Sequence, residues 1–405
     1  MRRVVVTGIG IASPLGCDVT EATARLRRNE HGIVRMTEWD AIGHFTPRVA
    51  APVAVPKALE IPHRDARTMG RVAQLSTIAT TIAVRDAGLG ADEFADGTIG
   101  LAYGSTNGSS KANEEWCRKL MAQNGFLGMT STTYLKFMSH TTAANLATHF
   151  GVHGRVICTS AACVSATQAL GHGFETIGSG LVDVMVCGGA EELHFTHAAV
   201  FDMLHAASKA TEPGLTPRPF DQKRDGLVVG EGAGTIVLEE YERAKRLGKK
   251  IYAEIIGFGT NCDGTHVTNP SADGMRGSME LALKSAQLGP DKIDYVNAHA
   301  TATSIGDIAE SQATYQLFGD RAPVSSLKGH IGHTLGACGA IELAFSIGML
   351  REGWIAPTRN LEEVGEGCAP LDYVKGEPRS AKLRRVMVNK FAFGGINTSL
   401  VVAAI

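Results

Sequence analysis

The sequence predicts a layered α/β protein in which helices cover both faces of a sheet. Short runs rich in Val and Ile alternate with longer helical patterns along the 405 residues. The strand-like runs are continuously apolar, which is typical of strands buried on both faces. The run Val4-Val-Val-Thr-Gly-Ile-Gly near the start resembles Ala253-Glu-Ile-Ile-Gly-Phe-Gly further on. This similarity is short, but it favours a duplicated unit.

The expected elements alternate along the whole chain. We expect strands at Arg3–Ile9, Thr98–Tyr103, Arg155–Cys158, Asp183–Cys187, Gly234–Glu239, Ala253–Gly259, Tyr295–Ala298, Ala322–Ser326, Arg385–Lys390 and Ser399–Ala404. We expect helices at Thr20–Arg28, Gly70–Ala87, Ala143–Phe150, Val164–Ser179, Tyr241–Leu247, Gly274–Ala286, Ile305–Phe318 and Gly336–Arg351. The stretches between them are short enough for ordinary loops, so we expect one composite domain. Within it, residues 1–250 form the first half and residues 251–405 the second.

The composition is that of an ordinary soluble globular protein, with 44% hydrophobic and 20% charged residues. A net charge of −2 offers no general attraction for nucleic acid or for an anionic membrane. Neither dinucleotide-binding nor P-loop glycine patterns occur in the right context. No apolar stretch reaches the roughly 18 residues of a membrane span. The glycine-rich N-terminal run fits a strand and turn better than a signal peptide, so we expect a cytoplasmic protein.

Among the eight cysteines, Cys163 is the candidate nucleophile. No CxxC pair or zinc-type Cys/His spacing occurs, so we expect reduced thiols and no metal site. Cys163 lies between an apolar strand-like run and a helix-like run, with small residues on either side. The positive end of a helix stabilises a thiolate and can lower the pKa of a thiol. The alternative is a buried structural cysteine, which is common for this residue type.

Two later segments rich in Gly, Ala and Thr carry polar groups that suit acyl chemistry. His299 lies in the first, and Lys328, His330 and His333 lie in the second. Imidazole and ammonium groups can stabilise an anion formed at a thioester carbonyl. Spacing alone does not distinguish His330 from His333, and Lys328 alone would more often be a solvated surface residue. The loop opening at Phe393-Gly-Gly lets backbone approach a ligand closely, although a hairpin turn is the alternative.

Together these segments resemble the β-ketoacyl-ACP synthases, the condensing enzymes of fatty acid and polyketide synthesis. The resemblance extends over the whole chain and rests on several motifs in the same order: Val4-Val-Val-Thr-Gly-Ile-Gly, Ser160-Ala-Ala-Cys163, Gly188-Gly-Ala-Glu191, Arg218-Pro-Phe-Asp, His299 to Asp307, Lys328 to Ala337, and Asn389 to Asn397. It implies a thiolase-like duplicated α/β fold in five layers, αβαβα. It also implies a homodimer, or a heterodimer with a related ketosynthase-like subunit.

The resemblance implies decarboxylative condensation of an acyl thioester with malonyl-ACP. Cys163 would receive the acyl chain from acyl carrier protein. His299 and His333 would bind the malonyl thioester carbonyl and stabilise the enolate left by loss of CO₂. No metal or redox cofactor would be required, because the substrates are carried on the phosphopantetheine of the carrier protein.

Other residues match supporting positions of the family. Lys328 and Glu310 match residues that support the site, and Phe393 matches a gating aromatic whose N–H would join that of Cys163 in an oxyanion hole. Two residues would touch the phosphopantetheine arm: Thr301 and Thr303. Three would border the acyl tunnel: Thr106, Asn107 and Met138. Four form an expected basic patch for the acidic carrier protein, or else a solvated charged face: Arg64, Arg67, Arg71 and Lys136.

Several positions depart from the family pattern: Leu227, Ala300, Ala302, Lys390, Ala392 and Ile396. They leave the catalytic atoms in place but could change the acyl pocket, so a polyene or polyketide pathway is as reasonable as primary fatty acid synthesis. Two other functions fit the sequence less well. A non-catalytic chain-length partner would lack the nucleophile, which this chain keeps. A thiolase would use a second late cysteine, and Cys338 and Cys368 do not lie in such a setting.

Overall fold

The computed structural model describes residues 1–405 and forms one continuous 11-stranded sheet with helices around it. All ten expected strands are present. Those of the first half are β1 (Val4–Ala12), β4 (Ile99–Gly104), β5 (Val156–Thr159), β6 (Val184–Glu191) and β7 (Gly232–Glu240). Those of the second half are β8 (Ala253–Cys262), β9 (Tyr295–Asn297), β10 (Pro323–Ser325), β14 (Arg385–Phe391) and β15 (Ile396–Ala403), with β12 (Asp372–Tyr373) added at the edge. Two small ribbons pair β2 (Val34–Arg35) with β3 (Val49–Ala50), and β11 (Trp354–Ile355) with β13 (Arg379–Ser380).

The strand order repeats between the two parts of the sheet. From the outside inward, one part runs β5-β4-β6-β7-β1 and the other β10-β9-β14-β15-β8. When the edge strand β12 is left out, each part has five strands, and their order is third, second, fourth, fifth and first along the chain. The first strands, β1 and β8, pair antiparallel where Val4, Val5 and Val6 face Ile255, Glu254 and Ala253. The two similar runs noted in the sequence therefore meet at the centre of a duplicated architecture.

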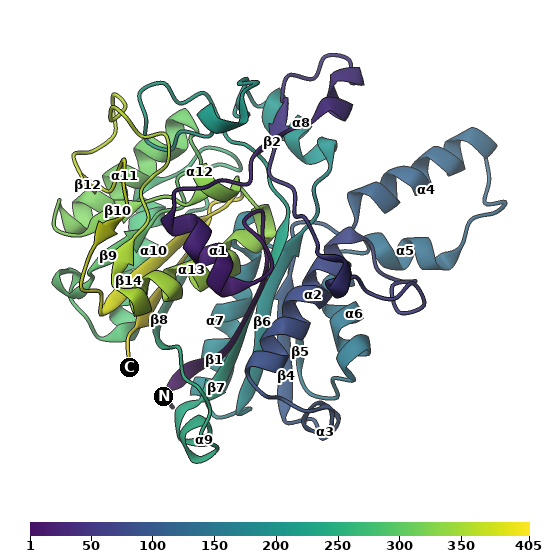
Figure 1. Ribbon diagram of the computed structural model, residues 1–405, viewed down its shortest axis with the longest axis horizontal. Helices are drawn as coiled ribbons and strands as arrows, with labels where there is room; N and C mark the ends of the chain where they lie inside the picture. The colour runs from purple at the N-terminus through teal and green to yellow at the C-terminus, as the bar shows by residue number, and fades with distance from the viewer.

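The helices complete five layers, as expected (Figure 1). On the outer face of the first part lie α2 (Arg71–Asp86) and α6 (Thr141–Phe150). On the outer face of the second lie α10 (Ala272–Ala286) and α11 (Ser304–Phe318). Between the two parts lie α7 (Ser165–Gly178) and α13 (Cys338–Glu352), which contact strands of both. α13 is apolar nearly all round because it is enclosed on every side.

The remaining helices lie at the margins. α1 (Val19–Arg27) and α9 (Tyr241–Arg246) were expected. Five were not: α3 (Ala91–Ala95), α4 (Ser110–Gln123), α5 (Ser131–Phe137), α8 (Phe195–Met203) and α12 (Lys328–Ile331). Short 3₁₀ turns occur as η1 (Thr37–Ala41), η2 (Lys57–Leu59), η3 (Ala162–Val164), η4 (Pro213–Leu215), η5 (Pro290–Lys292) and η6 (Leu335–Ala337). Figure 1 shows α4 and α5 projecting from the body as a separate arm. None of the helices combines the length and the apolar character needed to cross a membrane.

Candidate active site

Cys163 lies in a strained turn between β5 and α7. The strand ends at Thr159, and the 3₁₀ turn η3 carries Cys163 before α7 begins at Ser165, slightly later than the expected helix start. Ala162 has φ of 47°, in the left-handed region that costs about 1–2 kcal/mol for a residue with a Cβ. The Ser165 hydroxyl closes the turn by accepting from the Ala161 N–H at 2.9 Å and donating to the Ala162 carbonyl at 2.7 Å. Local strain of this kind is typical of a functional position.

His333 lies against the nucleophile. Its Nε2 lies 3.0 Å from the Cys163 sulfur. The ring of His299 lies 5.1 Å from that of His333, nearly perpendicular to it. The sulfur and one ring nitrogen of each histidine all lie within 4.8 Å of one another, and together they could also hold a soft divalent metal ion. The two ring nitrogens of His330 lie 3.0 Å from the carbonyl oxygens of Glu30 and Pro357, and one of them donates, which gives His330 a structural role.

Glu310 fixes the backbone that carries His299. Its two carboxylate oxygens accept from the N–H groups of His299 and Ala300, at 2.7 and 2.6 Å. The Asp307 carboxylate likewise accepts hydrogen bonds from the backbone N–H groups of Ala302, whose φ is 72°, and of Phe220. Both carboxyl groups are buried, and burial raises the pKa of each to about 7. These acids hold the His299 segment in one conformation.

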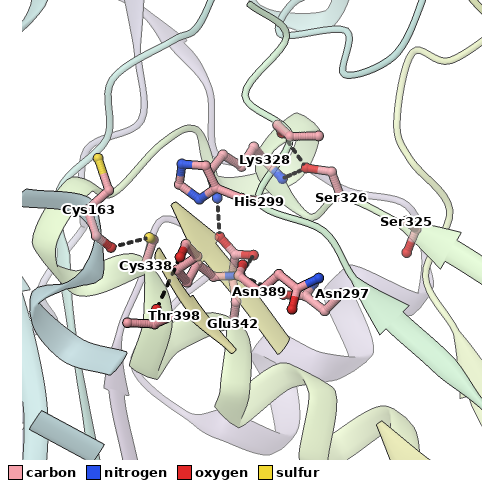
Figure 2. Close-up of polar contacts among 12 residues, drawn as sticks. Cys163, Asn297, His299, Ser325, Ser326, Lys328, Cys338, Glu342, Asn389 and Thr398 are labelled. Carbon is pink, nitrogen blue, oxygen red and sulfur yellow. Dashed lines mark hydrogen bonds and ion pairs between the residues drawn. The ribbon is translucent and has the colours of Figure 1, made fainter. Parts of the chain in front are cut away.

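Lys328 is not a surface residue. Its side chain is fully buried, and its ammonium lies 2.5 Å from Glu342 Oε1 on α13 (Figure 2). A second buried lysine, Lys390 on β14, approaches the other oxygen of the same carboxylate at 3.0 Å. From the sequence, Lys390 was predicted only to be a departure from the family pattern, and no role was predicted for Glu342. The signal for Glu342 was one acidic residue in the middle of the apolar run 338–350 of α13, since a buried charge requires a partner.

The electrostatics of the resting site differ from the sequence expectation. Burial raises the pKa of the Cys163 thiol, with Cys338 adding to this effect and Lys328 opposing it. The expected lowering of this pKa by the helix end is therefore wrong for the resting enzyme, because desolvation is the larger effect. Burial, and then the positive charge of Lys328, places the pKa of both His299 and His333 well below the usual value. A neutral thiol therefore faces two neutral imidazoles.

A cavity opens in front of these groups. Its lining includes Cys163, His299, His333 and Glu310, with Thr301 and Thr303 along one wall. The hydroxyls of those two threonines lie 3.1 Å apart. The rest of the lining is largely apolar, with Leu227, Phe391, Ala392 and Phe393 among it. The ring of Phe393 packs against Phe201 at 5.6 Å, and Gly394 and Gly395 follow it with φ of 84° and 69°.

The other expected site residues lie elsewhere. None of Thr106, Asn107 and Met138 lines this cavity in the single chain. Thr106 donates its N–H to Glu191, Asn107 borders a separate small pocket at the base of the α4–α5 arm, and Met138 follows α5.

The four expected docking residues do not share one helix. Arg64 and Arg67 lie in the turn before α2, while Arg71 begins that helix and Lys136 lies on α5. Arg71 is bonded to the buried carboxylate of Glu231 at 2.7 Å, whereas the side chain of Arg64 is 88% exposed. Arg71 therefore already has a partner within the chain.

Comparisons with known proteins agree with this architecture. Residues 1–244 match the family model for the N-terminal domain of beta-ketoacyl synthase, and residues 252–362 match that for its C-terminal domain. The chain is 35% identical over 404 residues to 3-oxoacyl-[acyl-carrier-protein] synthase 1 of Haemophilus influenzae, covering 99% of this chain and 98% of that protein.

Solved structures give the same result. A beta-ketoacyl synthase from Burkholderia phymatum has a TM-score of 0.96 and 48% identity, with 100% of both chains covered. The ishigamide ketosynthase/chain length factor has a TM-score of 0.92 and 31% identity, covering 100% of this chain and 99% of that one. The expected thiolase-like fold is confirmed. The chain belongs to the β-ketoacyl synthase family.

Proposed function

We propose that this protein is a β-ketoacyl-[acyl-carrier-protein] synthase that condenses an acyl thioester held on Cys163 with malonyl-ACP and releases CO₂. The observation that carries this proposal is the 3.0 Å approach of His333 Nε2 to the Cys163 sulfur, with His299 beside it at the cavity. The name of the Haemophilus influenzae relative supports the carrier-protein substrate.

In the first half-reaction, the Cys163 sulfur attacks the carbonyl of an acyl-ACP thioester. His333 Nε2 is within reach to accept the thiol proton, and the neutral state of its ring leaves it able to do so. The carbonyl oxygen becomes an oxyanion, for which the backbone N–H groups of Cys163 and Phe393 are the proposed donors. The C–S bond to the carrier then breaks, and the phosphopantetheine thiol leaves with the proton.

In the second half-reaction, malonyl-ACP enters while His333 is the neutral tautomer with its proton on Nε2. The malonyl thioester carbonyl accepts hydrogen bonds from His299 and His333. Loss of CO₂ leaves an enolate, and a donor aimed at such an oxygen is worth about 2.7–4 kcal/mol. The enolate carbon attacks the Cys163 thioester, a carbon–carbon bond forms, and the sulfur leaves as a thiolate that takes a proton from solvent to restore the thiol. The product is a β-ketoacyl chain on the carrier protein. No metal or redox cofactor takes part in these steps.

The remaining residues have proposed supporting roles. Thr301 and Thr303 would contact the phosphopantetheine arm, since both line the cavity. Lys328 would supply a positive charge beside the histidines. Glu310 would fix the backbone that carries His299. The acyl tunnel would be bordered by Thr106, Asn107 and Met138, with a second subunit completing it. Carrier-protein docking is assigned to Arg64, Arg67, Arg71 and Lys136.

The partner and the division of the chain are also proposals. The name of the ishigamide protein, a ketosynthase/chain length factor, supports a heterodimer with a related subunit. A homodimer is the alternative assembly, and the proposed pathway is fatty acid, polyene or polyketide synthesis. The alternative, a non-catalytic chain-length subunit, is disfavoured because the thiol and both imidazoles are retained together. The repeated strand order supports a division into residues 1–250 and 251–405.

Acyl loading tests the proposal. Incubation with acyl-ACP should add the mass of one acyl group to the wild-type chain and none to Cys163→Ala. Cys117→Ala, which removes an exposed thiol on α4, is the matched control and should load normally. Absence of an acyl-enzyme on the wild type, or loading of Cys163→Ala, would contradict the proposal.

A further inference from the structure

A small polar pocket lies at the base of the α4–α5 arm, and we call it the arm-base pocket. Phe137 is the only hydrophobic residue of its lining, and the others are Asn107, Gly108, Ser109, Ser110, Asn113 and Ser139. Its volume is about 210 Å³, which is room for a small functional group. Polar groups that lose water on binding need a hydrogen-bonding partner, so this lining suits a polar ligand group better than a hydrocarbon end.

Ser110 of the arm-base pocket is hydrogen-bonded to His197 of α8. The Ser110 Oγ lies 2.8 Å from His197 Nε2, and His197 Nδ1 lies 3.1 Å from the Glu192 carbonyl oxygen. Because a carbonyl can only accept, Nδ1 carries the ring proton and Nε2 accepts from the Ser110 hydroxyl. Burial lowers the pKa of His197 to about 4, so the ring is neutral near neutral pH. Ser110 therefore donates its only proton to His197, and its oxygen can still accept a hydrogen bond.

The arm-base pocket adjoins the turn that carries the nucleophile. The hydroxyl of Ser160, three residues before Cys163, donates to the Thr106 carbonyl at 3.3 Å. Asn107, the next residue, lines the pocket. A direct chain connection of two residues therefore joins this pocket to a segment in contact with the Cys163 turn.

Helix α8 leads from the cavity at Cys163 towards the arm-base pocket. Phe201 lines the cavity, and Ala198 packs in the same buried cluster as Cys163. His197 lies four residues before Phe201, which is about one turn, or about 6 Å, along the same face of the helix. An acyl chain on Cys163 that extends along α8, past the small side chain of Ala198, brings its far end to the Ser110–His197 pair.

We propose that the acyl chains accepted by Cys163 carry a hydroxyl group near their far end, and that this hydroxyl donates a hydrogen bond to Ser110 in the arm-base pocket. Ser110 contacts the substrate, and His197 is a positioning residue that holds the Ser110 hydroxyl in place. The inference deepens the proposed function and rests on it. The reaction that supplies the primer must then be one that leaves a hydroxyl group at the end remote from the thioester.

The free hydrogen-bonding capacity of Ser110 determines which end group fits. A methyl end would remove water from the Ser110 oxygen without offering it a donor, and a ketone end has no donor to offer. A hydroxyl both donates to Ser110 and can accept from the amides of the pocket lining. One neutral hydrogen bond of this kind changes the preference between two substrates about tenfold.

The test compares acyl groups of equal size. ω-Hydroxyoctanoyl-ACP and nonanoyl-ACP differ only in a terminal hydroxyl in place of a methyl, and shorter and longer pairs extend the comparison. Acylation of Cys163 by each is followed by mass spectrometry. The ratio of the two rates is taken within each protein, so that any loss of folded protein cancels.

Five variants are compared with the wild type. Ser110→Ala removes the acceptor, and His197→Leu removes the group that positions it. Ser110→Thr keeps a hydroxyl, and His197→Gln keeps an acceptor for that hydroxyl. Ser131→Ala, which removes an exposed serine at the start of α5, is the matched control.

The wild type, the control and the two conservative variants should load the hydroxylated chain about tenfold faster than its partner at the best-fitting length. Ser110→Ala and His197→Leu should lose this preference. Equal loading of both chains by the wild type, or an undiminished preference in Ser110→Ala, overturns the inference and leaves the proposed function intact. If no acyl-ACP loads Cys163, the proposed function fails and the inference fails with it.

Discussion

The sulfur of Cys163 and Nε2 of His333 lie 3.0 Å apart, although 170 positions separate the two residues in the chain. Cys163 follows β5 in the first part of the sheet, and His333 follows β10 in the second. Each is the third strand of its repeat. The next helix after Cys163 is α7 and the next after His333 is α13, and both lie in the central layer. The duplication therefore brings the nucleophile and its partner together from equivalent positions.

Removing either imidazole donor should slow decarboxylation strongly. His299→Ala and His333→Ala should each lower kcat for condensation by about 10²–10³-fold, because the enolate loses a preorganised donor. Initial rates with acyl-ACP and malonyl-ACP measure this loss. His172→Ala removes a partly exposed histidine of α7 and should keep the wild-type rate. Equal rates for all three variants would mean that His299 and His333 do not act on the enolate.

Removing the shared carboxylate should destabilise the fold. Glu342→Leu leaves Lys328 and Lys390 buried without their carboxylate, and losing one partner of a buried pair costs about 3–5 kcal/mol. Urea unfolding should show this loss, and adding Lys328→Met should recover part of it because one unpaired charge disappears. A double variant less stable than Glu342→Leu would contradict this view of the cluster.

Glu310 should make the free energy of unfolding depend on pH. Burial raises its pKa to about 7, above the roughly 4.3 of an unfolded glutamate. The protonated Glu310 side chain therefore contributes to the free energy of unfolding in full below about pH 4. This contribution is lost as the pH rises toward about 7. Glu310→Gln does not ionise, so the stability of the variant relative to wild type should rise across this range by on the order of 3 kcal/mol.

Urea unfolding of both proteins at several pH values measures this difference. The carboxyl groups of Asp307 and Glu191, whose pKa values are also raised to about 7, are present in both proteins, so their contributions largely cancel in the difference. A stability difference between Glu310→Gln and wild type that does not change with pH would show that the pKa of Glu310 is not raised in the folded protein.

The turn before the nucleophile should tolerate only small residues. Ala162 has φ of 47°, so Ala162→Gly should retain or slightly increase stability, whereas the β-branched Ala162→Val should lose about 1–3 kcal/mol. Thermal unfolding measures stability, and acylation of Cys163 reports whether the sulfur is still correctly placed. If Val is as well tolerated as Gly, the strain argument for this turn fails.

Chelation should leave the enzyme active. Because the proposed chemistry uses only side chains and backbone donors, treatment with EDTA should not change the rate of condensation. Added Zn²⁺ should inhibit, because Cys163, His299 and His333 offer three ligand atoms within 4.8 Å of one another. Loss of activity with EDTA, restored by a metal, would require a different mechanism.

The sequence predicted best the parts of the fold that are buried on both faces. The central strands and the enclosed helices α7 and α13 leave an apolar signal that does not depend on distant partners. The arm of α4 and α5 was missed because α4 buries only Ala112, so its apolar pattern is weak. Its exposed apolar residues, among them Phe126 and Leu127, gave no helical stripe.

The site was predictable only where residue type alone carried the chemistry. Cys163, His299 and Lys328 stood out by their context. Spacing did not separate His333 from His330, and the resemblance to the family selected His333. The physical reason for that choice lies in contacts with distant segments, since His330 faces the Glu30 carbonyl and His333 faces the Cys163 sulfur. The burial of Lys328 and its pairing with Glu342 also depended on tertiary structure. The thiol pKa was wrong because the helix end was weighed without the desolvation that burial imposes.

The most direct test of the account follows CO₂ and the new carbon–carbon bond in the same reaction. Malonyl-ACP labelled at the free carboxyl carbon is mixed with acyl-ACP, and labelled CO₂ is counted against β-ketoacyl product. The account expects one CO₂ for each product chain with the wild type and no product with Cys163→Ala. Product formed without release of label, or formed equally well by Cys163→Ala, would contradict it.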